Sequence, residues 1–95
     1  MPHPADDIIA RMQSPSAEDR LLIQKAYDIA KIAHGEEKRK SGEPYIIHPH
    51  DIALRLASLG MDRDTIIAGI LHDTVEDTTL TLEAIEKDFG PTVRF

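Results

Sequence analysis

Helix-starting and helix-ending residues alternate along this chain, and no other feature restricts its fold as strongly. Ser, Thr and Asp cap helix N-termini because their side-chain oxygens accept first-turn amide hydrogen bonds, whereas Gly and Pro end helices. The expected capping residues are Ser16, Asp62 or Asp64, and Thr81. The expected helix ends are Ser14-Pro15, Gly35, Gly60 and Gly90-Pro91. We therefore expect an all-α chain.

Between these signals, apolar residues recur with the helical period. We expect helices over 6–13, from 16 to about 34, from 48 to 60, across 66–75 and over 81–88, with a loop at 36–45. The expected core positions are Leu22, Ala26, Ile29, Ala30, Ala33, Ile52, Leu56, Leu59, Ile66, Ile67, Ile70, Leu71, Thr74 and Val75.

The composition excludes several classes of protein. Ninety-five residues make at most one small domain. A formal net charge of −6 argues against general nucleic-acid binding, which needs a basic face. No cysteine is present, so disulfides are excluded and a reducing, cytoplasmic location is natural. No apolar run is long enough for a membrane span, and the first residues do not resemble a signal peptide.

The candidate site is His72-Asp73 followed by Glu76-Asp77, directly after an apolar run. Residues four apart share a helix face, so Asp73 and Asp77 would repel each other, with no basic residue between 64 and 77 to compensate. A divalent cation would supply the missing positive charge. The alternative is an ordinary solvated acidic helix end, and these residues alone do not decide between the two.

His48-Pro49 favours the metal interpretation, because it adds a second imidazole at the expected first turn of the preceding helix. Two imidazoles and a carboxylate with open positions suit manganese, iron or magnesium better than structural zinc.

Two stretches, RKSGEPYIIHP at 39–49 and LHDTVEDT at 71–78, resemble the N-terminal hydrolase domain of the RelA/SpoT family. Members of that family make and break the stringent-response alarmones guanosine tetraphosphate and pentaphosphate. The resemblance implies an all-α, HD-domain-like helical bundle that hydrolyses the alarmone at its 3′ pyrophosphate with bound Mn²⁺.

Residue by residue, the resemblance implies that His48, His72 and Asp73 bind the metal. It also implies that Glu76 and Asp77 activate or position the attacking water, without binding the metal.

The resemblance further implies that Arg39, Lys40 and Ser41 face the guanine and phosphate groups of the nucleotide, in a loop at the mouth of the site. On charge alone, residues 38–40 would be interpreted as a solvated loop.

The chain departs from the family at its C-terminal end. A further Asp ligand of the family lies well downstream, and Asp88 is the last Asp here. We therefore expect residues 1–95 to be the N-terminal part of an incomplete hydrolase domain, inactive by itself. We also expect Ile67, Ile70, Leu71 and Val75 to lose their cover, giving weak stability or a homo-oligomer.

Two other functions stay open: another HD-type nucleotide phosphohydrolase, and a catalytically silent helical module that self-associates or binds a partner. Three further histidines are expected to be less important. We expect His34 to be structural at its helix end, His50 to lie on the surface unless it completes the metal site, and His3 to be disordered.

Overall fold

The computed structural model describes residues 2–35, 42, 44–78, 80–90 and 93. Those residues form five helices and no β-strand, so the all-α prediction is confirmed. The helices are α1 (Asp6–Ala10), α2 (Ala17–His34), α3 (Ile47–Ser58), α4 (Arg63–Asp77) and α5 (Leu82–Phe89).

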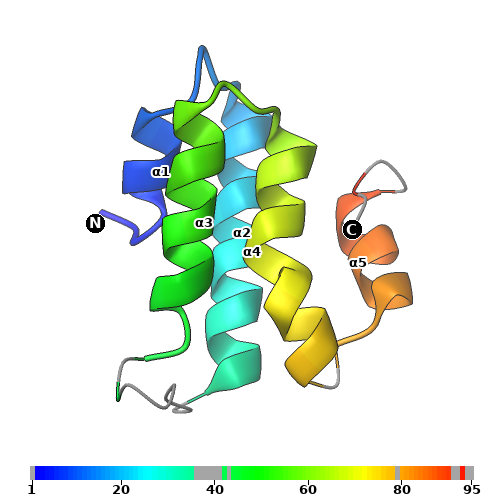
Figure 1. Ribbon diagram of the computed structural model, residues 1–95. Helices are drawn as coiled ribbons and strands as arrows, with labels where there is room; N and C mark the ends of the chain where they lie inside the picture. Colours follow the sequence, from blue (N-terminus) through cyan, green and yellow to red (C-terminus); the bar gives the residue numbers. More distant parts are fainter. Residues whose placement is uncertain (1, 36–41, 43, 79, 91–92, 94–95) are drawn as a thin grey trace.

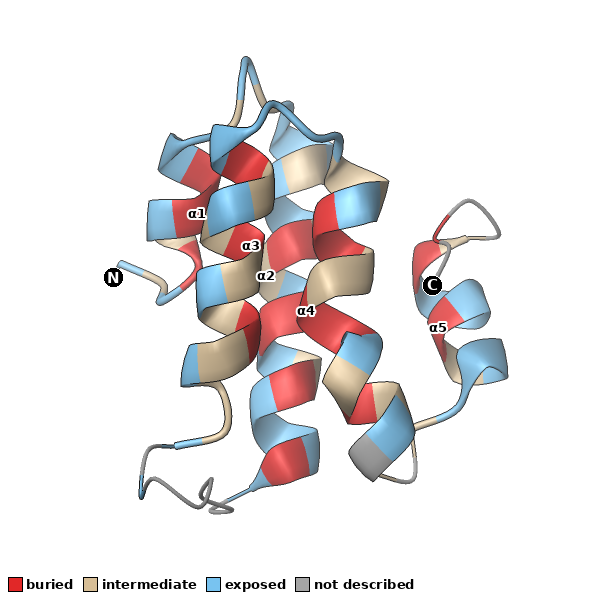
Figure 2. Ribbon diagram, viewed as in Figure 1, coloured by how far each residue is buried: buried red, intermediate tan, exposed pale blue. Residues whose placement is uncertain are grey.

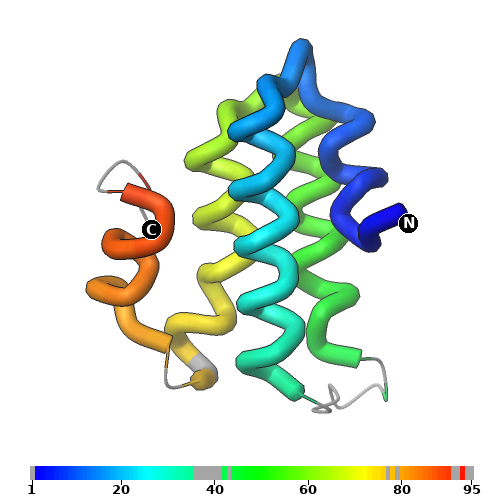
Figure 3. The backbone as a smooth tube through the Cα atoms, turned by 180° about the vertical axis from the view of Figure 1, so that it is seen from behind, coloured from blue at the N-terminus to red at the C-terminus, as the bar shows by residue number. Residues whose placement is uncertain are grey.

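Helix α4 is the centre of the arrangement, because it packs along both α2 and α3. The short helix α1 packs against α3 and α2. Figures 1 and 3 show α1 to α4 side by side, with α5 set apart beyond α4. The N-terminal segment and α5 therefore lie on opposite sides of the bundle.

The predicted caps are confirmed where the structure describes them. Ser16 and Asp19 form a reciprocal capping box at the start of α2. Asp62, rather than Asp64, caps α4 by accepting a hydrogen bond from the Thr65 amide over 2.9 Å. Thr81 caps α5 in the same way.

Helix α3 ends as predicted at Gly60, whose φ of 78° suits a residue without a side chain. The Gly60 amide donates to the Ala57 carbonyl, and the Met61 amide donates to the Leu56 carbonyl. This pair of bonds is the Schellman motif, and it turns the chain directly into α4.

The inner face of α4 is fully buried, as the red bands in Figure 2 show. Ile66, Ile67, Ile70 and Leu71 each have 0% exposure. The expectation that Ile67, Ile70 and Leu71 would be uncovered is therefore wrong, and only Val75 is partly exposed. The instability and self-association predicted from that surface lose their premise, because α2 and α3 cover α4 within this chain.

The predicted inner faces of α2 and α3 need correction. Ala33 is exposed, and the buried residues of α2 are Ile23, Ala26, Tyr27, Ala30 and His34. On α3 the buried residues are Pro49, Ala53 and Ala57, while Leu59 is 71% exposed. On α3 the small residues Ala53 and Ala57 are fully buried, whereas the larger Ile52 and Leu56 are only partly buried, so choosing the largest apolar residues identified the wrong face.

Helix α1 ends at Ala10 instead of Gln13. Ser14 has a φ of 47°, which no helix residue adopts, and the following Pro15 disfavours a helical conformation at Ser14. The chain therefore leaves the helix early and turns toward the capping box of α2.

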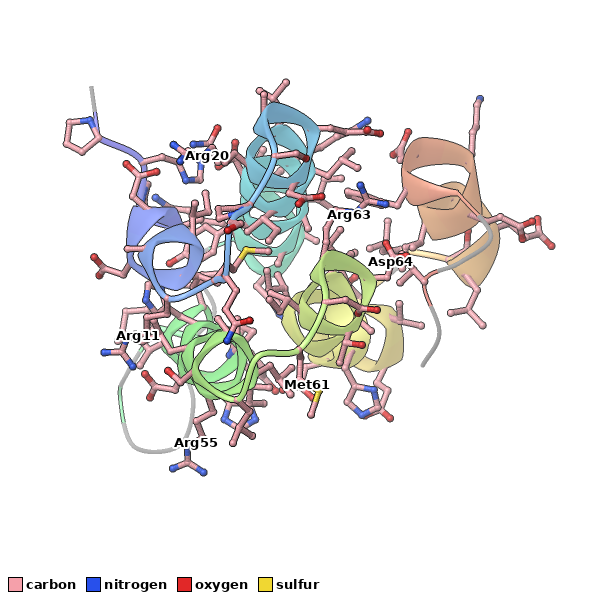
Figure 4. The ribbon with its side chains drawn as sticks, turned by 90° about the horizontal axis from the view of Figure 1, so that it is seen from above. Arg11, Arg20, Arg55, Met61, Arg63 and Asp64 are labelled. Carbon is pink, nitrogen blue, oxygen red and sulfur yellow. The ribbon has the colours of Figure 1, made fainter. Side chains whose placement is uncertain are left out.

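Polar contacts join α2 to its neighbours. Arg63 at the start of α4 lies 3.2 Å from Asp19 of α2 and 3.2 Å from its neighbour Asp64. Figure 4 shows Arg63 and Asp64 from above. Lys25 of α2 reaches α5, with Nζ 3.7 Å from Asp88 and 5.6 Å from the centre of the Phe89 ring. Such solvent-accessible pairs orient the helices but stabilise them by about 1 kcal/mol or less each.

Across the part of the chain that the structure describes, no helix combines the length and the apolar character that crossing a bilayer requires.

Replacing Asp62 by Ala should lower the free energy of unfolding by about 1 kcal/mol at pH 7, because α4 loses its cap. Hydrogen bonds from Thr65 lower the pKa of Asp62. The stabilisation is therefore present above the unfolded-state pKa of about 3.9 and is lost as the pH falls through the lower folded-state value. Urea unfolding at pH 7 and pH 3 checks this, and an equal difference at both values would contradict it.

Replacing Gly69 by Ala should destabilise the chain, because Gly69 is the point where α3 approaches α4. A Cβ there would lie 2.6 Å from Leu56 Cδ1 and 3.3 Å from Ile52 Cγ2. Overpacking costs about 1–3 kcal/mol, against about 1 kcal/mol gained in helix propensity. In a Leu56→Ala background the same change should become neutral or stabilising, as thermal melts of the four variants would reveal.

Candidate metal centre

The last turns of α4 bring one imidazole and two carboxylates together. One ligand atom from each of His72, Asp73 and Glu76 lies within 4.8 Å of the other two. His72 Nε2 is 3.5 Å from Glu76 Oε1, the i,i+4 pairing expected from the sequence. His72 and Glu76 are more than half exposed, so the cluster opens to solvent.

Helix α3 brings His48 beside this cluster, although His48 is not among the described residues whose ligand atoms all lie within 4.8 Å of one another. His48 Nε2 lies 3.3 Å from Asp73 Oδ2, and the two side chains are 37% and 22% exposed. His48 stands in the first turn of α3, where Pro49 is compatible with the helix because first-turn amides have no intrahelical acceptor. Asp73 therefore lies between the imidazole from α3 and the remaining donors on its own helix.

These donors fit a divalent cation. Imidazole nitrogen and carboxylate oxygen with open positions together suit Mn²⁺, Fe²⁺ or Mg²⁺ better than structural zinc. The C-terminal end of a helix carries partial negative charge, and the last turn of α4 contains no basic residue to neutralise it. A bound cation would offset both the carboxylates and the helix dipole.

Not every predicted site residue falls within this description. Arg39, Lys40 and Ser41 lie outside the described residues, and so does the side chain of Asp77. Their assigned roles stay predictions. Asp88 lies on α5, where it pairs with Lys25.

His34 has the structural role expected of it, through partners that the sequence did not indicate. It is the last residue of α2, is 3% exposed, and has Nε2 3.2 Å from Thr74 Oγ1 on α4. Its ring also stacks on the Tyr45 ring, with centres 4.4 Å apart and planes 12° apart. Thr74, adjacent to Asp73, was predicted only as part of the core.

His50 does not have the purely surface role predicted for it. The Tyr27 hydroxyl lies 2.9 Å from His50 Nδ1, and the two rings meet edge to face. Burial raises the pKa of Tyr27, as do the nearby Asp7 and Asp28 carboxylates, so the hydroxyl keeps its proton for this contact at neutral pH.

The prediction that His3 is disordered is wrong. His3 Nε2 lies 2.8 Å from Asp28 Oδ1, and the His3 ring meets the edge of the Tyr27 ring. The His3 amide also donates to the Asp6 carboxylate at the start of α1. These contacts fix the N-terminal segment on α2.

Residues 26–94 match the family model described as "HD domain". The chain belongs to the HD domain family. Every donor of the candidate metal centre lies within the matched residues, so the cluster on α4 is part of the HD domain.

Curated relatives support the resemblance seen in the motifs. A guanosine-3′,5′-bis(diphosphate) 3′-pyrophosphohydrolase of Aquifex aeolicus is 63% identical over 75% of this chain. GTP pyrophosphokinases of Streptomyces coelicolor and Brucella ovis are 49% and 42% identical over 90% and 92% of this chain. The chain spans 10%, 10% and 12% of the lengths of these three relatives.

Replacing Asp73 by Asn should weaken Mn²⁺ binding by at least about tenfold, because Asp73 is the carboxylate closest to both His48 and the donors on α4. Changes to residues that only support metal ligands already lower metal affinity by about 10–100-fold. Electron paramagnetic resonance of free Mn²⁺ measures the affinity. The matched control is Asp7→Asn on α1, an exposed carboxylate away from the cluster. Equal affinities of the two variants would contradict a metal centre at Asp73.

Proposed function

We propose that residues 1–95 are the N-terminal part of an HD-type hydrolase domain that removes pyrophosphate from the 3′ position of guanosine tetraphosphate or pentaphosphate. Water attacks the phosphorus next to the 3′ oxygen, the P–O3′ bond breaks, and pyrophosphate leaves with the former water oxygen. For the tetraphosphate the other product is GDP. This chemistry needs an activated water and relief of phosphate charge.

The single observation that carries the proposal is the cluster on α4 with His48 beside it, in an HD domain whose motifs match an alarmone hydrolase. Relatives named for the opposite activity, GTP pyrophosphokinase, match the same region of this chain. That match fits a parent protein with both activities.

His48, His72 and Asp73 would hold the metal, and the expected ion is Mn²⁺. A bound divalent cation lowers the pKa of water and polarises a phosphate oxygen. The remaining chemistry falls to side chains of this chain, of which His72 and Glu76 are more than half exposed and so accessible to water and substrate.

Glu76 is the best candidate for the general base. Its side chain is 61% exposed and lies one turn beyond His72, so it can accept a proton from a water held beside the cluster. His72 Nε2 lies 3.5 Å from Glu76 Oε1, so this carboxylate stands beside the proposed ligand. Asp77 is assigned the neighbouring water-positioning role by resemblance alone.

The substrate contacts are likewise proposed by resemblance. Arg39 would stack its planar guanidinium on guanine, Lys40 would bring a compact charge to phosphate, and Ser41 would donate a hydrogen bond. A cytoplasmic location agrees with a nucleotide substrate and with the lack of cysteine.

Replacing Glu76 by Gln should lower alarmone hydrolysis by about 10²–10⁴-fold, the usual contribution of a general base, while leaving bound Mn²⁺ unchanged. Release of pyrophosphate and metal content are measured together on the protein that carries this sequence. Glu86→Gln on the exposed face of α5 is the matched control.

Three outcomes would contradict the role of Glu76 or the proposed function. Joint loss of metal and activity would make Glu76 a ligand. If the wild-type protein releases phosphate from other nucleotides but not from the alarmone, it is another HD-type phosphohydrolase. If it binds metal and hydrolyses none of these nucleotides, it is a silent helical module.

A further inference from the structure

His34 is a buried side chain that contacts both segments carrying the donors of the metal centre. It is 3% exposed at the C-terminal end of α2. A contact with Thr74 leads to α4, and a contact with Tyr45 leads to the start of α3.

The contact to α4 is made through Thr74, which has 0% exposure and directly follows Asp73. Thr74 Oγ1 lies 3.2 Å from His34 Nε2. The Thr74 carbonyl also accepts hydrogen bonds from the Thr78 hydroxyl and amide, over 2.6 and 3.0 Å. The turn of α4 that contains Asp73 and Glu76 is therefore fixed from inside the bundle at Thr74.

The contact to α3 is made through Tyr45, whose ring stacks on His34 in a nearly parallel arrangement. The Tyr45 carbonyl accepts a hydrogen bond from the His48 amide over 3.3 Å. A fixed Tyr45 therefore also fixes the first turn of α3, which contains His48.

We infer that His34 is a positioning residue that sets the spacing of His48 and Asp73, and so the metal affinity of the site. The 3.3 Å approach of His48 Nε2 to Asp73 Oδ2 joins two helices, and a single buried ring on a third helix fixes both partners. This inference rests on the proposed metal-dependent function and adds to it a structural determinant outside the ligand set.

The test compares Mn²⁺ dissociation constants of paired variants on each side of His34. Thr74→Val removes the hydroxyl at nearly constant volume, and Thr74→Ser restores it. Tyr45→Ala removes the ring, and Tyr45→Phe restores it. Ile32→Ala, at a 79% exposed position of α2, is the control for changes on this helix.

The Val and Ala variants should bind Mn²⁺ about 10–100-fold more weakly, the usual loss when an outer-shell partner is removed. The Ser, Phe and Ile32→Ala variants should bind like the wild-type chain. His34→Ala combined with Thr74→Val should weaken binding less than the sum of the single changes, because both break one contact. Circular dichroism at the titration temperature identifies variants that remain folded.

Folded Val and Ala variants with wild-type affinity would overturn the inference, and so would Ser or Phe variants that bind as weakly as their partners. If Thr74→Val does not fold, the Tyr45 pair decides the question, since Tyr45 lies at the partly exposed edge of the bundle. Alarmone hydrolysis by the wild-type protein is assayed separately. Its absence together with these affinity changes would refute the proposed function and leave the role of His34 in place.

Discussion

The burial of α4 between α2 and α3 is the constraint on which the rest of the structure depends. The four apolar side chains Ile66, Ile67, Ile70 and Leu71 are fully buried, and each such side chain stabilises the fold by about 1.5–3 kcal/mol. Because this apolar stripe fixes the rotation of α4, it also fixes which way the following polar residues point. His72 and Glu76 face solvent, whereas Thr74 points into the bundle.

Close packing of α3 on α4 brings the two halves of the candidate metal centre together. Gly69 leaves room for Leu56 and Ile52, so the helices approach closely. His48 at the first turn of α3 then reaches Asp73 near the last turns of α4. The like-charged carboxylates and the negative end of α4 are electrostatically unfavourable together, and a cation is the group that relieves this most directly.

Polar contacts around the site join α2 to the two helices that carry the proposed ligands. His34 connects α2 to α4 and to the start of α3, and His50 in the first turn of α3 meets Tyr27 of α2. Helix α2 supplies no proposed ligand, yet it holds both helices that do. Precise spacing of ligands on two separate helices requires such support, because rotation of either helix would separate the donors.

Local signals in the sequence determined where the helices are. Ser16, Asp62 and Thr81 cap helices in the structure because capping depends only on residues within one turn. The motif at residues 71–78 likewise identified the HD domain and the cluster of His72, Asp73 and Glu76, since three residues on adjacent positions of one helix share a region whatever surrounds it. The apolar run of α4 was identified as core-forming, but the expectation that Ile67, Ile70 and Leu71 would be uncovered in this chain was wrong, because α2 and α3 cover them.

Tertiary structure decided everything that depends on distance between helices. The sequence suggested that His48, at the start of one helix, joins Asp73 near the end of the next, but only the packing of α3 on α4 fixes the distance between them. The buried face of α3 was predicted one position away from the true one, because only the partner helix selects which of several apolar residues faces inward. On α2 the prediction was right for Ala26 and Ala30 but wrong for Ala33. The partners of His3, His34 and His50 were also beyond the sequence, since an imidazole acquires its contacts from the Asp, Thr or Tyr that the fold places beside it.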